Sequence, residues 1–300
     1  MTSTPAGSLG AVELLPLPRT GRTPVRVLTI AGTDSGGGAG IQADSRTMAL
    51  CGVHAVVAVA AVTVQNTVGV SRFHEIPPDV VADQVRAVVG DIGIGAAKTG
   101  MLASTAIIDA VADVCGEVGL GRAGSIPLVV DPVCASMHGD SLLRPDALDA
   151  VRHTLIPLAT VVTPNLDEVR LITGIDVIDD TTARRAAELL HHLGAQWALV
   201  KGGHLRGAAT STDLLYDGDR MISYTRPRVA TGNDHGAGDT LAAAIASALA
   251  HGRSVPEAVE FAKEWVSRCL AAAYDLGAGH GPVSPFWRLS RPDNRAGCSE

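Results

Sequence analysis

The sequence contains few aromatic residues, few cysteines and no surplus of basic charge. Only 3% of its 300 residues are Phe, Trp or Tyr, whereas 46% are hydrophobic and 18% are charged. This apolar fraction excludes an intrinsically disordered chain, because disordered chains contain too few apolar residues to form a core. A chain of this length buries roughly three quarters of its extended surface on folding, which is enough for one large domain.

The charge balance argues against binding to nucleic acid. The chain carries 24 Lys and Arg residues against 31 Asp and Glu residues, a net charge of −7, and contains no block of basic residues. Binding along a nucleic-acid phosphate backbone requires clustered Lys and Arg residues. We therefore expect small-molecule partners and no nucleic acid.

Cysteine usage predicts a reducing compartment. The five cysteines are odd in number and widely spaced, and they form no Cys-x-x-Cys motif or Cys/His metal motif. Such spacing is not that of a disulfide framework or a zinc site. The pattern predicts free thiols in a cytoplasmic protein.

No segment predicts export or membrane insertion. The first residues lack a basic stretch ahead of an apolar core, so they do not form a secretory signal. The longest uncharged run, residues 47–71, is interrupted by His54, two side-chain amides and two glycines. We interpret this run as a helix end, a buried strand and a loop, not as a membrane span.

The chain is predicted to form one domain with a tail at each end. Residues 1–23 are small, polar and proline-bearing, which predicts a loose tail, and residues 289–300 form a second polar tail. No repeat, low-complexity stretch or linker divides residues 24–288. This central part is expected to fold as a unit.

Short β-branched runs alternate with longer amphipathic runs along the chain. The predicted strands cover residues 25–31, 55–64, 128–130, 160–162 and 197–200. The predicted helices cover residues 78–89, 105–118, 145–155, 181–193 and 256–273. Such alternation is typical of a mostly parallel sheet with helices on both faces, an α/β fold. The Asp217-Gly218 pair predicts one hairpin, between residues 213–216 and 221–224.

Polar, glycine-containing stretches follow the predicted strands. They are residues 32–38, 65–67, 98–101, 131, 163–165 and 201–203. The carboxyl ends of parallel strands meet at one edge of a sheet, where open α/β sheets bind ligands. Any one of these stretches is explained as an ordinary polar loop, but six together predict a binding site.

The first glycine-rich loop is a weak match to a dinucleotide site. Its Gly38-x-Gly40-x-x-Ala43 pattern follows a predicted strand, but no Asp or Glu lies between Asp44 and Glu75 to hold a ribose. NAD is therefore disfavoured. Lys98-Thr99 does not form a Walker motif either, because it is preceded by Ala97 and not by the glycine that the motif requires.

A second glycine-rich segment, residues 232–240, leads into an Ala-rich helix. The small residues Gly236, Ala237 and Gly238 allow backbone N–H groups at the helix N-terminus to surround an anion, such as a transferring phosphoryl group. Asp239 in the first turn is kept ionised by the helix dipole and is a candidate proton acceptor. From the local pattern alone, an ordinary capping acid explains Asp239 equally well.

Seven stretches together carry a family resemblance. They are LTIAGTDSGGGAGIQAD at 28–44, QNT at 65–67, KTGM at 98–101, VDPV at 130–133, TPNLDE at 163–168, KGGH at 201–204 and HGAGD at 235–239. The chain resembles the ribokinase superfamily, and within it the hydroxymethylpyrimidine/phosphomethylpyrimidine kinases of thiamine biosynthesis. The resemblance covers about residues 25–286. It implies a three-layer α/β/α ribokinase-like fold with a mostly parallel central sheet.

The resemblance also implies substrate-binding residues. It places the pyrimidine against Asp44, Gln65, Met101 and Val133, with the Gln65 amide reading polar atoms of the ring, a role that suits a group with both donor and acceptor. Taken without the family, the alternatives are that Asp44 is a solvated helix acid and that Met101 is a plain core residue.

For ATP, the resemblance implies a phosphate site and a metal site. Lys201, Asn165 and His235 would contact ATP or its phosphates, beside the cradle and Asp239 already described. Glu168 and Asp131 would hold Mg²⁺, mainly through water, because this ion prefers oxygen ligands. Other interpretations remain open, since Asn-x-x-Glu is also a helix-capping pattern and Lys201 is also consistent with a surface lysine.

The expected activity is ATP-dependent phosphorylation of 4-amino-5-hydroxymethyl-2-methylpyrimidine, first to the monophosphate and then to the diphosphate. The expected state is a cytoplasmic homodimer. The family commonly carries Cys where this chain has Asp239, whereas ribokinase-like sugar kinases carry Asp there. A pyridoxal/pyridoxine kinase and, from a different class, a non-catalytic pyrimidine-binding sensor remain as alternatives.

Overall fold

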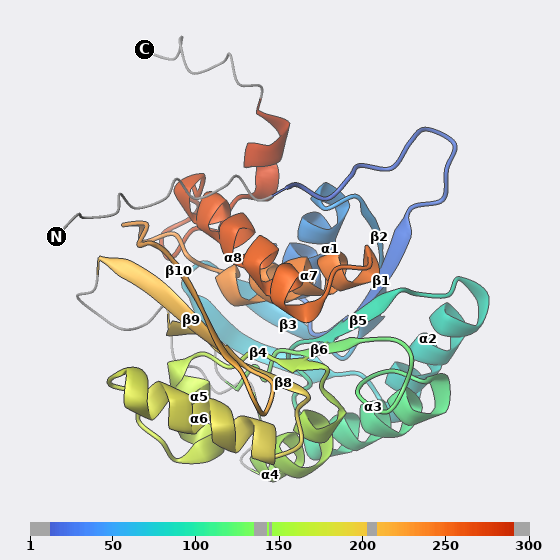
Figure 1. Ribbon diagram of the computed structural model, residues 1–300. Coiled ribbons are helices and arrows are strands. Elements are labelled where there is room, and N and C mark those ends of the chain that lie inside the picture. The colour runs from blue at the N-terminus through green and yellow to red at the C-terminus, as the bar shows by residue number, and fades with distance from the viewer. Residues whose placement is uncertain (1–12, 135–142, 144–145, 203–208, 291–300) are drawn as a thin grey trace, which may run out of the picture.

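A computed structural model describes residues 13–134, 143, 146–202 and 209–290 of the chain. Its centre is an eight-stranded sheet in the order β10-β9-β8-β7-β6-β5-β1-β2 (Figure 1). The strands are β1 Val25–Ala31, β2 Val53–Val59, β5 Ala96–Thr99, β6 Leu128–Val130, β7 Val161–Val162, β8 Trp197–Val200, β9 Thr210–Tyr216 and β10 Met221–Pro227. Strands β2, β1, β5, β6, β7 and β8 are parallel to one another, and β9 and β10 run antiparallel at one edge.

Helices cover both faces of this sheet, as Figure 1 shows. One face carries α1 Gly40–Leu50, α7 Ala237–Ala250 and α8 Val255–Ala271, and the other carries α2 Pro78–Asp91, α3 Thr105–Val118, α4 Ala147–Ala150, α5 Leu166–Thr173 and α6 Asp180–His192. Successive side chains of a strand point to opposite faces. Accordingly, Leu28 and Ile30 pack in one core cluster and Val27 packs in the other. The predicted three-layer α/β/α fold is confirmed.

Local sequence signals explain where several helices begin. Asn165 precedes α5 and Asp179 precedes α6, and each side chain accepts a hydrogen bond from the backbone N–H of the third helical residue. Ser254 and Glu257 form a capping box at the start of α8, which also has proline in its first turn. These contacts satisfy N–H groups that the helix itself leaves free.

The strand predicted over residues 55–64 is wrong as a single element. Strand β2 ends at Val59, and after a break at Ala60 the chain continues as β3 Ala61–Asn66, which pairs with β4 Gly69–Glu75 in a separate two-stranded antiparallel sheet. The sequence has no charged residue, glycine or proline at this break, so hydrophobic periodicity does not reveal that one strand ends and another begins here. Consequently Gln65 lies within a strand of the small sheet, not after a strand of the main one.

The hairpin and most other elements agree with the sequence prediction. Strands β1, β6 and β8 and helix α3 have the predicted bounds, and β9 and β10 pair across a four-residue loop that contains Asp217 and Gly218. The first residue of the helix predicted over 145–155 lies outside the described part of the chain. From Ala147 to Leu155, α4 continues into a π-helical turn.

Part of the expected N-terminal tail is docked. Leu15 is only 1% exposed and packs in the cluster that contains Met48, and its carbonyl accepts a hydrogen bond from Arg288. Arg253 donates to the carbonyl of Glu13 at 2.7 Å. The prediction of a loose tail is therefore wrong for this short segment, because one leucine finds an apolar site. The predictions for residues 1–12 and 291–300 lie outside the described residues.

The cysteine prediction agrees with the structure where it applies. Four cysteines are free and buried, namely Cys51, Cys115, Cys134 and Cys269. The fifth, Cys298, lies outside the described residues. Within the described ranges, no helix is both long enough and apolar enough to span a bilayer.

Candidate active site

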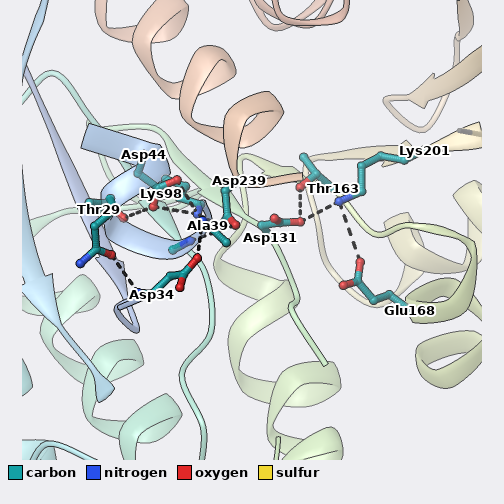
Figure 2. Close-up of polar contacts among 12 residues, drawn as sticks. Thr29, Asp34, Ala39, Asp44, Lys98, Asp131, Thr163, Glu168, Lys201 and Asp239 are labelled. Atoms are coloured by element: carbon teal, nitrogen blue, oxygen red, sulfur yellow. Dashed lines mark hydrogen bonds and ion pairs between the residues drawn. The ribbon is translucent and has the colours of Figure 1, made fainter. Parts of the chain in front are cut away.

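Chain segments at the carboxyl edge of the parallel sheet bring the polar residues together. The loop after β1 leads into α1, Asp131 follows β6, Thr163 follows β7 and Lys201 follows β8. Helix α7 starts against the same edge. Figure 2 shows the resulting arrangement, in which Asp239 pairs with Lys98 and lies toward Asp131, which pairs with Lys201 in a separate ionic group.

The segment predicted to form the cradle lies at the N-terminus of α7. Gly236 has φ of 75°, which places it in the left-handed region, and a Cβ there would collide with the carbonyl of Gly38. A Cβ on Gly238 would instead point toward the Lys201 Nζ at 3.4 Å and Asp131 Oδ2 at 3.6 Å. The Ala237 N–H donates to the Asp234 carbonyl at 3.1 Å. The next N–H groups of this helix have no acceptor inside the helix, so they can bind an anion next to that ammonium group.

Lys201 is the centre of a buried ionic cluster. Its Nζ lies 2.9 Å from Asp131 Oδ1 and 3.9 Å from Glu168 Oε2, and Thr163 donates to Asp131 Oδ1 at 3.0 Å. The three charged side chains are 12%, 3% and 7% exposed, respectively. The alternative that Lys201 is a surface lysine is therefore wrong.

Burial changes the acidity of this cluster. It raises the pKa of Glu168 to about 7; the Lys201 ammonium opposes this shift, whereas the Asp131 carboxylate adds to it. The pKa of Lys201 is also raised: burial alone would lower it, but the Asp131 and Glu168 carboxylates outweigh burial. Two carboxylates around one ammonium leave a negative surplus at this edge.

Asn165 and Glu168 form a capping box at the start of α5. The Asn165 side chain accepts from the Glu168 N–H at 2.9 Å, and the Glu168 carboxylate accepts from the Asn165 N–H at 2.8 Å. The capping alternative is thus confirmed. The Glu168 carboxylate still faces Lys201, so capping does not remove it from the site.

Asp239 belongs to a second ionic group, which lies in the interior. Lys98 Nζ donates to Asp239 Oδ1 at 2.9 Å and to both carboxylate oxygens of Asp44, each at 2.9 Å. Lys98 and Asp44 side chains are 0% exposed, whereas the Asp239 side chain is 15% exposed. The alternative that Asp44 is a solvated acid is therefore wrong.

The two carboxylates of this group differ in acidity. Burial raises the pKa of Asp44 to about 7 against the opposing charge of Lys98. Burial also acts to raise the pKa of Asp239, but attraction to Lys98 and a hydrogen bond from the Gly40 N–H outweigh it, so that pKa is lowered. Asp239 is therefore ionised at neutral pH.

His235 and Asp34 join the two glycine-rich loops. The His235 Nε2 donates to Asp34 Oδ2 at 2.9 Å, and the Asp34 carboxylate also accepts from the backbone N–H groups of Gly36, Gly38 and Ala39. Attraction to His235 and these N–H donors lower the pKa of Asp34 although burial acts to raise it. Through its hydrogen bond to Asp34, His235 therefore fixes the conformation of the glycine-rich loop after β1. The sequence did not indicate this contact.

The expected substrate residues occupy one side of the site. Met101 is buried with Ala61 and Ala103, and Val133 and Phe73 pack against them. Gln65 projects from β3 with its amide nitrogen 3.5 Å from His235 Nε2. Gln65, Met101 and Val133 thus lie around the small sheet beside the cradle. Asp44 differs, because both of its carboxylate oxygens accept hydrogen bonds from protein side chains, those of Thr29 and Lys98.

Lys98 has a role that the sequence motifs did not reveal. The motif places this lysine after a strand, whereas Lys98 lies inside β5 and is fully buried. The available signal was a single charge in the otherwise uncharged strand Ala96–Thr99. A buried lysine requires a carboxylate partner, and that expectation would have pointed to Asp44 or Asp239. Of the motif residues, Gly203 and His204 lie outside the described ranges.

Comparisons with known proteins agree on one family. The family model described as phosphomethylpyrimidine kinase matches residues 34–284. The hydroxymethylpyrimidine/phosphomethylpyrimidine kinase of Mycobacterium tuberculosis is 64% identical over 279 residues, which cover 93% of this chain and 100% of that protein. The protein of the same name from Streptomyces coelicolor is 50% identical over 268 residues, covering 89% and 96%.

Solved structures show the same fold. The ADP complex of Bacillus subtilis pyridoxal kinase superimposes with a TM-score of 0.80 at 33% identity, covering 89% of this chain and 99% of that one. Phosphomethylpyrimidine kinase from Clostridium difficile gives a TM-score of 0.71 at 36% identity, covering 81% and 98%.

Proposed function

This chain belongs to the phosphomethylpyrimidine kinase family, and from that premise we propose how its site works. It is a bifunctional hydroxymethylpyrimidine/phosphomethylpyrimidine kinase of thiamine biosynthesis. The γ-phosphoryl group of ATP passes first to the hydroxyl group of 4-amino-5-hydroxymethyl-2-methylpyrimidine and then to the resulting monophosphate. The observation that carries this function is the placement of an ionised Asp239 in the first turn of the α7 cradle, within the same site as Lys201.

In our proposal, the cradle stabilises the transferring group. The N–H groups at Gly236 and Gly238 and the Lys201 ammonium group surround the phosphoryl oxygens, and the α7 dipole adds favourable field. The Ala237 N–H supports the cradle indirectly, because it donates to the Asp234 carbonyl at 3.1 Å. Phosphoryl transfer depends mainly on such positioning and electrostatics. Two further residues support the ATP-binding part of the site. Asn165 fixes the main chain at Glu168, and His235 fixes the loop before α7.

Asp239 serves as the proton acceptor in the first step. Its carboxylate takes the proton from the pyrimidine hydroxyl as the oxygen–phosphorus bond forms, and the bond from the γ-phosphorus to the ADP oxygen breaks. The lowered pKa of Asp239 keeps it in the accepting form. In the second step the nucleophile is a phosphate oxygen that is already ionised, because the second pKa of a phosphate monoester is about 6. That step does not need the carboxylate.

The pyrimidine lies between the small sheet and the cradle. Gln65 binds polar atoms of the ring through its amide, and Met101 and Val133 supply an apolar wall. Asp44 acts indirectly, since its oxygens are held by Thr29 and Lys98. We therefore propose that Asp44 does not contact the pyrimidine, as the resemblance implied, but supports the site through Lys98.

The donor set beside the cradle fits Mg²⁺. Asp131 and Glu168 provide hard oxygen atoms and a negative surplus, and Mg²⁺ is commonly bound by one or two carboxylates together with substrate phosphates and water. Among the described residues, no group of three or more His, Cys, Asp and Glu side chains forms a complete metal site. Mg²⁺ bound with ATP would neutralise phosphate charge, while Asp131 and Glu168 hold it mainly through water.

The fold neighbours make pyridoxal kinase the competing substrate assignment. Bacillus subtilis pyridoxal kinase is the specific observation in its favour, at 33% identity. A non-catalytic sensor is set aside, because the chain belongs to a kinase family and retains the cradle. The test is a product assay with MgATP and either heterocycle. We expect pyrimidine monophosphate followed by diphosphate; a higher kcat/KM for pyridoxal would overturn the pyrimidine assignment.

We also propose a cytoplasmic homodimer. Support for a second copy comes from the outer face of β3, where Val62 and Val64 are 45% and 46% exposed, and from Val68 in the following turn, 58% exposed. Support for a reducing compartment comes from the four free, buried cysteines. Light scattering of the purified protein, compared with a Val62→Glu variant, tests the dimer.

A further inference from the structure

Lys98 is a fully buried cation that cannot serve as a ligand for ATP. Its ammonium group has three N–H donors. They are directed to Asp44 Oδ1, Asp44 Oδ2 and Asp239 Oδ1, with each distance 2.9 Å. The side chain is 0% exposed. A bound phosphate would therefore have to displace a carboxylate, so the lysine must act through its two partners.

The two carboxylates are held in different ways. Asp44 is 0% exposed and has a further hydrogen bond from Thr29, at 2.7 Å, so it is fixed entirely within the protein. Asp239 is held at Oδ1 by Lys98 and at Oδ2 by the N–H of Gly40, at 3.1 Å. Each carboxylate oxygen has two acceptor positions. The partly exposed Asp239 therefore keeps acceptor capacity on the side that faces the site.

We infer that Lys98 is a positioning residue for transfer to the alcohol: it fixes and keeps ionised the Asp239 carboxylate, and Asp44 holds Lys98 in place. This inference rests on the proposed role of Asp239 as proton acceptor. It assigns to the buried pair a function other than stability. A buried ion pair adds little net stability compared with apolar residues of similar size, so its presence beside the reacting group requires another explanation.

The surrounding charges support this arrangement. Besides Lys98, the groups that act on Asp239 or its partners are His235 from the loop before α7, Asp44 from α1, Asp131 after β6 and Lys201 after β8. The pKa of Asp44 is raised by burial, whereas that of Asp239 is lowered because Lys98 outweighs burial.

The experiment compares the pH dependence of the alcohol step in three variants. Lys98→Met removes the ammonium group at similar length, and Lys98→Met/Asp44→Asn also removes the carboxylate that would be left unpaired. Arg226→Met is the matched control, because Arg226 is 9% exposed and forms a 2.9 Å ion pair with Glu264 between the edge strand β10 and α8. Transfer to the alcohol and to the monophosphate is measured from pH 5 to 9 at saturating MgATP.

We expect the double variant to lose the alcohol step selectively. The acid limb of its rate should move up by about one to three pH units, the size of effect that a nearby opposite charge produces. The rate should recover at high pH, and transfer to the monophosphate should change little. The Arg226→Met variant should keep the wild-type profile. A carbon-13 NMR titration of the Asp239 carboxyl group, assigned with Asp239→Asn, should show the same shift without turnover.

The outcomes separate this inference from the proposed function. If Asp239→Asn slows both transfers equally, the assignment of Asp239 as base fails, whatever Lys98 does. If Asp239→Asn is selective but the Lys98 variants show an unshifted acid limb and an unshifted NMR titration, the inference about Lys98 alone fails. An equal loss of both transfers in the Lys98 variants with no recovery at high pH would assign Lys98 a structural role and overturn the inference.

Discussion

The carboxylate of Asp239 accepts a 3.1 Å hydrogen bond from the backbone N–H of Gly40, across 199 residues of sequence. Gly40 is the first residue of α1, and Asp239 lies in the first turn of α7. The two helices thus begin against each other, and the acceptor of the proposed proton transfer is fixed by both glycine-rich loops. The same approach is why a Cβ at Gly236 would collide with Gly38.

Replacing Gln65 should weaken pyrimidine binding without affecting ATP binding. In Gln65→Leu, polar atoms of the ring would lose their partner in a closed site, which costs about 1–3 kcal/mol. Calorimetry with the pyrimidine alcohol and, separately, with an ATP analogue measures both affinities. Gln196→Leu, at an exposed position before β8, is the control. An unchanged pyrimidine affinity in Gln65→Leu would remove Gln65 from the substrate site.

Adding one methyl group at Gly238 should separate activity from stability. The Ala Cβ would lie 3.4 Å from Lys201 Nζ, in ordinary contact with the protein but in the space proposed for phosphoryl oxygens. We expect Gly238→Ala to lose roughly 10²-fold in kcat/KM for ATP, because small misplacements are costly in catalysis. Its melting temperature should not fall, since Ala is the better helix former.

The matched control for that change is Gly116→Ala in α3. A Cβ at Gly116 meets nothing within 4 Å, and the position is helical, so only helix propensity changes. Full activity in Gly238→Ala would show that the phosphoryl group does not approach this point of the cradle.

The N-terminal segment should contribute to stability. Leu15→Ala should lower the free energy of unfolding by about 2–5 kcal/mol, the usual range for a buried leucine. Leu17→Ala should have little effect, because Leu17 is 53% exposed. Urea denaturation of both variants measures the difference. Equal midpoints would mean that Leu15 is not docked in solution.

Hydrophobic periodicity predicted those helices and strands whose sequence signal lies within the element itself. The β-branched run at β1 and the amphipathic run at α3 have the observed bounds, since period and flanking residues identify them without tertiary information. The strand break at Ala60 and the burial of Leu15 depend instead on tertiary contacts with distant parts of the chain. No local pattern contains that information.

The site shows the same division. The glycines and Asp239 before and within α7 could be predicted as site candidates because a helix N-terminus has its own sequence signature. The Lys98 network was not, because its members come from β5, α1 and α7 and only the fold brings them together. The pairing also explains why Asp44, expected as a substrate ligand, is occupied by protein partners.

The most direct test of the proposed chemistry is the single-turnover rate of Asp239→Asn with each substrate supplied separately. The proposed mechanism predicts that transfer to the alcohol falls by roughly 10²- to 10⁴-fold, the usual contribution of a general base, while transfer to the monophosphate is largely kept. The variant must first be shown to be folded and to bind ATP. Equal losses in the two transfers would contradict the mechanism and make Asp239 a residue that supports the α7 N-terminus and not the proton acceptor.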